Sequence, residues 1–245
     1  MRYKAAATPR LRLFCFPYAG GAAHIFRQWP QGLPPSVEVC AVQPPGRGGR
    51  LRERPITSLR QLVAEAAPAL RPYMDLPFAF FGHSMGAVVA FELAHHLRGA
   101  RADGPAQLFV SGCRAPQLAR EGDFTYNLPE PEFLAEIRRL KGTPPEVLEH
   151  PELLELVLPL LRADFTAIHT YEYSEVPPLT CPLTVFGGVE DEDVGVESLK
   201  AWRAHTTAAF TLRMLPGDHF FLHGSQPLLL EALNRDLRRL ADTSP

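Results

Sequence analysis

The stretch FAFFGHSMGAVVAFELA, residues 78–94, changes character at its centre. Its first four residues form an apolar run typical of a strand that is buried on both faces. The residues from Val88 onward have the spacing of a helix. No loop separates the two, so the chain must turn sharply at Ser84. Glycine at positions 82 and 86 removes the side chains that would clash in such a turn.

Ser84 is the residue that this turn would expose. Its hydroxyl would stand at the start of a helix, where backbone N–H groups and the helix dipole stabilise a developing negative charge. The pattern G-x-S-x-G between a strand and a helix is the nucleophile elbow of serine hydrolases. The alternative is a glycine-rich turn with an incidental serine, and the strand–helix setting favours the nucleophile.

Composition restricts the class of protein. The chain has 245 residues, of which 46% are hydrophobic and 21% are charged, which fits one domain spanning residues 1–245. The net charge of −2 does not favour a nucleic-acid partner. The apolar run near the N-terminus is too short for a signal peptide, and no run has the length of a membrane span. We therefore expect a cytoplasmic monomer without a membrane partner.

The four cysteines, at positions 15, 40, 113 and 181, are scattered along the chain. They form no C-x-x-C pair and no cluster with histidine at the spacing of metal ligands. We expect free thiols in a reducing compartment, and no metal site.

Strand-like and helix-like segments alternate along the chain. Strands are predicted at residues 11–16, 37–42, 78–81, 108–111, 183–186 and 210–215, and helices at 58–74, 85–97, 197–205 and 227–241. This alternation predicts an α/β fold in which helices flank a mostly parallel central sheet.

An insertion at about residues 116–176 interrupts the alternation. It contains an apolar helical stripe at 133–140 and a second helical segment that begins at Pro151, with Pro159 as an expected kink. The second segment is apolar around most of its circumference, so we expect it to contact the body on one side and something else on the other. A helical lid over an apolar pocket fits this pattern, and extra helical core is the alternative.

A serine nucleophile needs a base and a third group that orients the base. In hydrolases with this elbow, the acid and then the histidine follow the serine along the chain. His219 follows a Pro-Gly-Asp turn at the carboxyl end of the last strand, where the sites of open α/β sheets collect. His223 is expected to face solvent or the lid. The acidic run at 190–193 supplies the acid, and the pattern leaves Asp191 and Asp193 nearly tied.

The alkoxide that forms during acyl transfer needs two backbone donors. Met85, the residue after the nucleophile, would supply one. The glycine-rich turn in FCFPYAGG, residues 14–21, would supply the other, from the N–H of Ala19 or of its neighbour Tyr18. A plain turn between a strand and a helix is the alternative for this segment.

Six short motifs span nearly the whole chain in order: FPYAGG at 16–21, QPPGR at 43–47 with Arg50 following, GHSMG at 82–86, SGCRAP at 111–116, FGGVED at 186–191 and GDHFF at 217–221. In these motifs the chain resembles the type II thioesterases that accompany polyketide and nonribosomal peptide synthetases. The resemblance implies an α/β-hydrolase fold, in which the insertion is a helical lid.

The resemblance also implies roles for residues. The acid becomes Asp191, which breaks the tie with Asp193, and the oxyanion donors become the N–H groups of Ala19 and Met85. Thioesterase domains fused to synthases are similar, but they often carry the acid after the preceding strand, where this chain reads SGC at 111–113.

By the same resemblance, Ser84, His219 and Asp191 would hydrolyse stalled or aberrant acyl groups from the phosphopantetheine arm of acyl- or peptidyl-carrier proteins. This editing reaction would proceed through an acyl-serine and would need neither a metal nor another cofactor.

Three other functions stay open. A small-ester hydrolase or lipase would use the same triad. A non-catalytic protein that binds carrier proteins would require a broken triad, and none of the three positions is broken here. Transfer of the acyl group to an alcohol or amine depends on how well the lid excludes water.

The arginines at positions 47, 50, 52 and 54 form a basic segment. It could dock an acidic carrier protein, or it could be a solvated loop in which Glu53 balances one charge.

Overall fold

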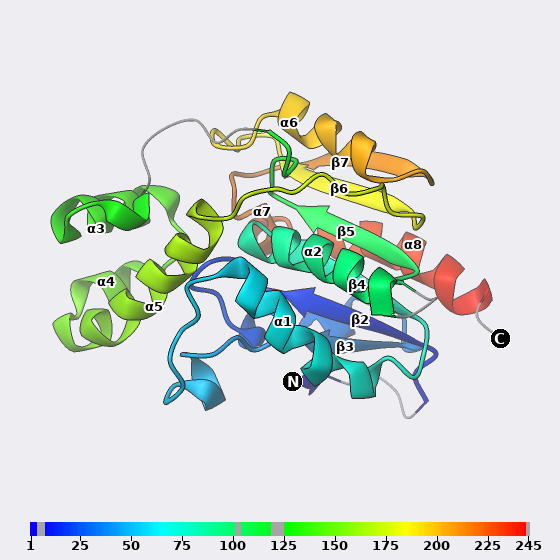
Figure 1. Cartoon of the computed structure of the whole chain (residues 1–245), viewed down its shortest axis with the longest axis horizontal. Helices are drawn as coiled ribbons and strands as arrows, with labels where there is room; N and C mark the ends of the chain where they lie inside the picture. Colours follow the sequence, from blue (N-terminus) through cyan, green and yellow to red (C-terminus); the bar gives the residue numbers. More distant parts are fainter. Residues whose placement is uncertain (4–7, 101–103, 119–124, 244–245) are drawn as a thin grey trace.

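The computed structural model describes residues 1–3, 8–100, 104–118 and 125–243 (Figure 1). Seven strands form one sheet in the order β1-β3-β2-β4-β5-β6-β7. Their bounds are β1 Arg2–Tyr3, β2 Leu11–Phe16, β3 Val37–Ala41, β4 Phe78–His83, β5 Gln107–Ser111, β6 Leu183–Gly188 and β7 Phe210–Leu215. Neighbouring strands from β3 to β7 are parallel, and only β1 pairs antiparallel, with β3. The predicted α/β fold with a mostly parallel sheet is confirmed.

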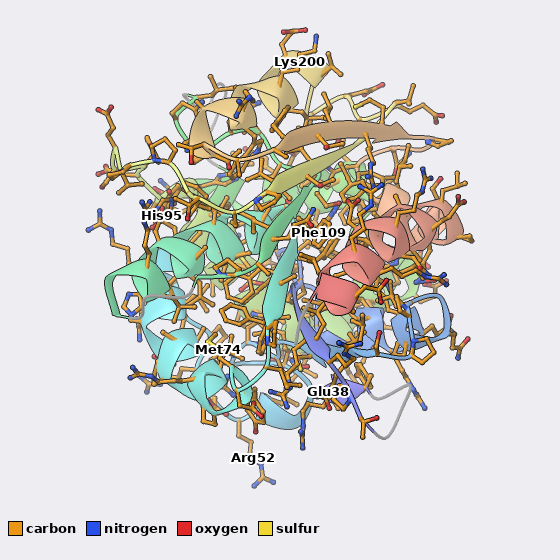
Figure 2. The ribbon with its side chains drawn as sticks, turned by 90° about the vertical axis from the view of Figure 1, so that its right-hand side faces the viewer. Glu38, Arg52, Met74, His95, Phe109 and Lys200 are labelled. Carbon is orange, nitrogen blue, oxygen red and sulfur yellow. The ribbon has the colours of Figure 1, made fainter. Side chains whose placement is uncertain are left out.

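Side chains alternate between the two faces of the sheet, as the pleat of a strand requires. On β4, Phe78 and Phe80 belong to the core on one face, while Ala79 and Phe81 belong to the core on the other. The first core is covered by α1 (Leu59–Leu70), α2 (Met85–Ala100) and α6 (Val196–Lys200), and the second by α8 (Gln226–Thr243). In Figure 2 the sheet is seen between α2 and α8, with Phe109 near α8.

The predicted helices differ from the observed ones mainly at their ends. The helix predicted at 58–74 begins after Ser58, whose hydroxyl accepts a hydrogen bond from Gln61 N–H at 3.4 Å and so caps α1. It ends at Leu70, and a short 3₁₀ helix, Arg71–Tyr73, completes the segment. The helix predicted at 197–205 is likewise divided into α6 and a 3₁₀ helix, Ala201–His205. A four-residue helix, α7 (Phe221–Gly224), precedes α8 and was not predicted.

Three helices lie beyond the carboxyl ends of the strands: α3 (Glu130–Leu140), α4 (Pro145–Glu149) and α5 (Pro151–His169) (Figure 1). They share a small core of Phe133, Ile137, Leu148, Leu161 and Phe165. Residues 119–124 of the predicted insertion lie outside the described residues. The assignment of 116–176 as a lid on a single domain remains a prediction.

No described helix is long and apolar enough to cross a lipid bilayer. The four cysteines all lie in the described residues and form no disulfide; Cys15, Cys40 and Cys113 are buried, and Cys181 is half-buried.

The backbones of β2, β4 and α2 come closest together at two glycines. A Cβ added to Gly82 would lie 2.1 Å from Gly86 O, and one added to Gly86 would lie 2.2 Å from Phe16 O. Both obstacles are backbone atoms, which cannot rotate away. The two glycines therefore allow α2 to start directly against the ends of β2 and β4.

We predict that Gly86→Ala destabilises the fold by about 1–3 kcal/mol or more, because the new methyl group must displace backbone. Urea unfolding of the purified variant measures this loss. Gly224→Ala is the control, since a Cβ there meets no atom within 4 Å. Equal unfolding midpoints for the two variants would contradict the steric explanation.

Candidate active site

Ser84 is the single residue between β4 and α2. Its φ is +52°, a left-handed conformation that non-glycine residues adopt rarely. The turn is held by two hydrogen bonds, from Ser84 N–H to Ser111 O at 2.8 Å and from Ala87 N–H to Ser84 O at 3.0 Å. The strained elbow predicted from the two glycines is thus present, and Ser84 lines a cavity at its tip.

His219 lies in the turn after β7 and lines the same cavity as Ser84. Its Nδ1 is 2.8 Å from Asp191 Oδ2. The other oxygen, Asp191 Oδ1, accepts hydrogen bonds from the N–H groups of Asp193 and Val194, both at 3.0 Å. The Asp191 side chain is 0% exposed, so these bonds replace the water that its charge would otherwise bind. With the Nδ1 hydrogen donated to Asp191, Nε2 is the nitrogen that can accept a proton.

The two acids that the sequence pattern left tied have different partners. Asp193 points to the insertion, where Arg139 of α3 donates to both of its oxygens, at 3.0 and 3.3 Å. Both side chains of this pair are substantially exposed. Asp191 alone of the two contacts His219 in the described structure.

The turn after β2 brings Ala19 to the cavity beside Ser84 and Met85. Two neighbouring donors in the turn already have acceptors: Gly20 N–H donates to Asp164 Oδ2 at 2.7 Å, and Gly21 N–H donates to Tyr18 O at 2.9 Å. Within the described ranges, no hydrogen-bond acceptor faces the N–H of Ala19 or of Met85. The geometry therefore leaves both groups available to an oxyanion.

His83, the residue before Ser84, is fully buried next to His219, with the two ring centroids 5.2 Å apart. Its Nδ1 lies 2.8 Å from Ser111 Oγ. Burial holds the pKa of His83 well below its usual value, and the nearby rings of His219 and His223 lower it further. A neutral ring there adds no positive charge beside the His219 ring. His223, expected to face solvent or the lid, is exposed and lies 3.0 Å from the Tyr18 hydroxyl.

The cavity has a volume of about 520 Å³, within the usual range for a small-molecule site. Helices of the insertion provide five apolar side chains of its wall: Ile137, Leu140, Leu161, Phe165 and Ile168. Polar side chains, among them Arg114, Glu136 and Arg139, line other parts. The arrangement suits an apolar chain whose polar end reaches Ser84.

Sequence reasoning missed one feature of this region. Arg47 was grouped with the basic segment, as a docking or solvated residue, and both interpretations are wrong for it. Its side chain is 4% exposed and forms a double hydrogen bond with Asp164 of α5, at 2.6 and 2.7 Å. Arg50 pairs with Glu53, as the solvated-loop alternative expected, while Arg52 extends away from the body (Figure 2). Asp164 is the one acid in the part of α5 after Pro159, where most other residues are apolar, and this was the available signal for it.

A family model described as a thioesterase domain matches residues 11–237. The chain belongs to the thioesterase domain family. One relative of this thioesterase, linear gramicidin dehydrogenase LgrE of Brevibacillus parabrevis, is 47% identical over 238 residues, which is 96% of this chain and 90% of LgrE.

Solved structures agree with the family match. RedJ, a thioesterase from the prodiginine pathway of Streptomyces coelicolor, superimposes with a TM-score of 0.86 at 42% identity, covering 94% of this chain and 86% of RedJ. BorB, a type II thioesterase from the borrelidin cluster, has a TM-score of 0.86 at 34% identity, with 97% and 95% covered. The predicted resemblance to type II thioesterases and the predicted enzyme class, a thioester hydrolase, are confirmed.

We predict that Asp191→Asn lowers kcat by about 10⁴-fold, because an amide at this position favours the wrong imidazole tautomer. Asp193→Asn, which loses only the exposed pair with Arg139, should lower kcat by less than about tenfold. Steady-state hydrolysis of an acyl thioester of a short thiol measures both. Equal losses, or a larger loss at Asp193, would reverse the assignment of the acid.

Proposed function

We propose that this thioesterase removes stalled or aberrant acyl groups from the phosphopantetheine arm of acyl- or peptidyl-carrier proteins in polyketide or nonribosomal peptide synthesis. The observation that carries the proposal is the arrangement of one cavity: Ser84 on a strained elbow and His219 held by Asp191 both line it. RedJ, from the prodiginine biosynthetic pathway, and BorB, a type II thioesterase from the borrelidin biosynthetic cluster, support a role in biosynthesis.

In the first half-reaction, His219 Nε2 accepts the hydroxyl proton of Ser84 while Ser84 Oγ attacks the thioester carbonyl carbon. The carbonyl π electrons move to oxygen, and the oxyanion is stabilised by the N–H groups of Ala19 and Met85. The tetrahedral intermediate collapses, the C–S bond breaks, and the imidazolium protonates the departing thiolate. The carrier leaves with a free thiol, and the acyl group remains on Ser84.

In the second half-reaction, His219 takes a proton from water, and the resulting hydroxide attacks the acyl-serine carbonyl. The same two N–H groups receive the second oxyanion. Collapse breaks the bond to Ser84 Oγ, which regains its proton from His219. The fatty or peptidyl acid is released. Asp191 keeps the imidazole oriented and stabilises its positive charge in both halves.

The cavity supports broad acyl tolerance. Its apolar wall comes from leucine, isoleucine and phenylalanine side chains on α3 and α5, which can surround chains of different shape. An apolar pocket discriminates by only about 1–3 kcal/mol per methylene, so chain length should change the rate gradually. Such tolerance suits an enzyme that clears many kinds of stalled intermediate.

In this proposal residues 1–245 act as one domain, with 116–176 as its lid. The enzyme works in the cytoplasm as a monomer that meets carrier proteins, without a nucleic-acid or membrane partner. The reaction uses neither a metal nor another cofactor.

The name of LgrE suggests a second candidate, a dehydrogenase. A dinucleotide site in an α/β sheet normally uses a G-x-G-x-x-G turn between a strand and a helix. The turn after β2 instead reads Pro-Tyr-Ala-Gly-Gly, and the turn after β4 presents a serine. The geometry of Ser84 and His219 favours acyl transfer.

The test presents one acyl group in three forms: on a carrier protein, on a short thiol and as a simple alcohol ester. We expect kcat/KM to be highest for the carrier-bound thioester and lowest for the alcohol ester. If the simple ester is the best substrate, a lipase-like small-ester hydrolase replaces the editing thioesterase as the proposed function.

A companion prediction concerns the nucleophile. Ser84→Ala should lower kcat by about 10³-fold or more while the unfolding midpoint stays close to that of the wild type, because no packed group is lost. A serine-directed phosphonate should label Ser84 in the wild type. Labelling at another residue would overturn its role.

A further inference from the structure

A buried ion pair connects the insertion to the loop beside the nucleophile. Arg47 follows β3, and Asp164 lies on α5, 117 residues later. Arg47 Nη1 is 2.6 Å from Asp164 Oδ2, and Arg47 Nη2 is 2.7 Å from Asp164 Oδ1. The side chains are only 4% and 1% exposed. Other ion pairs between the insertion and the body, Arg139–Asp193 and Lys141–Asp218, are exposed.

The pair also binds two backbone groups of the turn after β2. Asp164 Oδ2 accepts a second hydrogen bond, from Gly20 N–H at 2.7 Å. Arg47 Nη1 donates to Gly21 O at 3.0 Å, and Arg47 Nε donates to Pro45 O at 3.3 Å. The carboxylate therefore holds the Ala19–Gly20 peptide group of this turn, and the guanidinium holds the Gly21–Ala22 peptide group.

Packing reinforces these bonds. Gly20 has a φ of +79°, and a Cβ added there would lie 2.6 Å from Leu161 Cδ2. Leu161 is one turn before Asp164 on α5, and it also lines the cavity. Helix α5 thus presses on Gly20 with one side chain and accepts its N–H with another.

We propose that Asp164 and Arg47 are positioning residues that set the direction of the Ala19 N–H group. The peptide group between Ala19 and Gly20 is fixed by the bond from Gly20 N–H to Asp164. That peptide adjoins the one that carries the Ala19 N–H, so rotation about the bonds of Ala19 would turn this donor away from the oxyanion. The inference rests on the proposed acyl transfer at Ser84 and identifies the group through which α5 contributes to it.

A purely structural role is the competing explanation. Buried ion pairs are expensive to desolvate, and replacing one with apolar residues of similar volume is often neutral or stabilising. An apolar replacement therefore distinguishes the structural role from the positioning role, because it can keep α5 packed while it removes the acceptor of Gly20 N–H. A paired replacement that retains a carbonyl oxygen at position 164 is the complementary variant.

The experiment compares Arg47→Met/Asp164→Leu, which has no acceptor, with Arg47→Gln/Asp164→Asn, which keeps one. Substrates are a short acyl p-nitrophenyl ester and a short acyl thioester. An alkyl boronic acid, which forms a tetrahedral adduct with serine, reports on the oxyanion site without turnover. Arg213→Met/Asp236→Leu is the control, since it removes a partly buried pair, 3.0 Å long, whose residues do not line the cavity.

We expect the acceptor-free variant to lose about 10- to 100-fold in kcat, less than the cost of deleting an oxyanion donor outright. Its affinity for the boronic acid should fall by a similar factor, while KM changes less than about threefold. The variant with asparagine should recover most of both losses. The control should keep kcat within about twofold of the wild type.

Equal kcat values for the two double variants, both folded by circular dichroism, would overturn the inference, and so would a loss confined to KM. If the apolar pair does not fold, Arg47→Gln/Asp164→Ala takes its place and differs from the asparagine variant only at position 164. The simple ester allows the two proposals to fail separately. If the wild type cleaves this ester but not carrier-bound thioesters, the proposed function is contradicted. The comparison of the two double variants on the ester still tests the role of Asp164.

Discussion

The chain passes from β4 to α2 with one residue between them, and every part of the site is arranged around that turn. Gly82 and Gly86 let three backbone segments touch where any larger residue would collide with a carbonyl group. The resulting φ of +52° at Ser84 is unfavourable by itself, and the surrounding sheet and helix hold it in place. Ser84, Met85 and the turn after β2 consequently line the same cavity.

The groups around Ser84 are held by contacts from different parts of the chain. His219 is oriented by Asp191, whose second oxygen is held by two backbone N–H groups. The turn that carries Ala19 is held by Asp164, a residue of the insertion. Part of the cavity wall and the support of the Ala19 turn thus come from the same helix, α5. In the proposed reaction, a change that moves α5 would alter substrate fit and chemistry together.

Most strands and helices could be predicted from the sequence, because apolar runs indicate the buried strands and glycine-rich segments indicate the turns between elements. The apolar runs of β2 and β7 gave correct bounds, and Ser84 and His219 each follow a strand end where sites of α/β sheets collect. Strand β1 could not be found, since two residues carry no periodic pattern. The contact between Asp191 and His219 was expected only through a resemblance, because alternating acids in a loop look alike in sequence.

The ion pair between Arg47 and Asp164 could not be predicted for a further reason. The two residues are 117 positions apart, and no local sequence pattern indicates that they meet. Asp164 also lies on a helix whose character changes along its length. Before Pro159, Leu153 and Leu156 are 45% and 52% exposed, while Leu160 and Leu161 beyond it are buried. Proline has no N–H to donate to Glu155 O, so the helix is least stiff at the boundary between the two halves. The half of α5 after Pro159 is bonded to the body through Asp164, whereas the half before it packs through Leu154, Val157 and Leu158 on the core that the insertion forms by itself. If the insertion acts as the proposed lid, bending at Pro159 would move the first half together with α3 and α4 and leave the second half against the Ala19 turn.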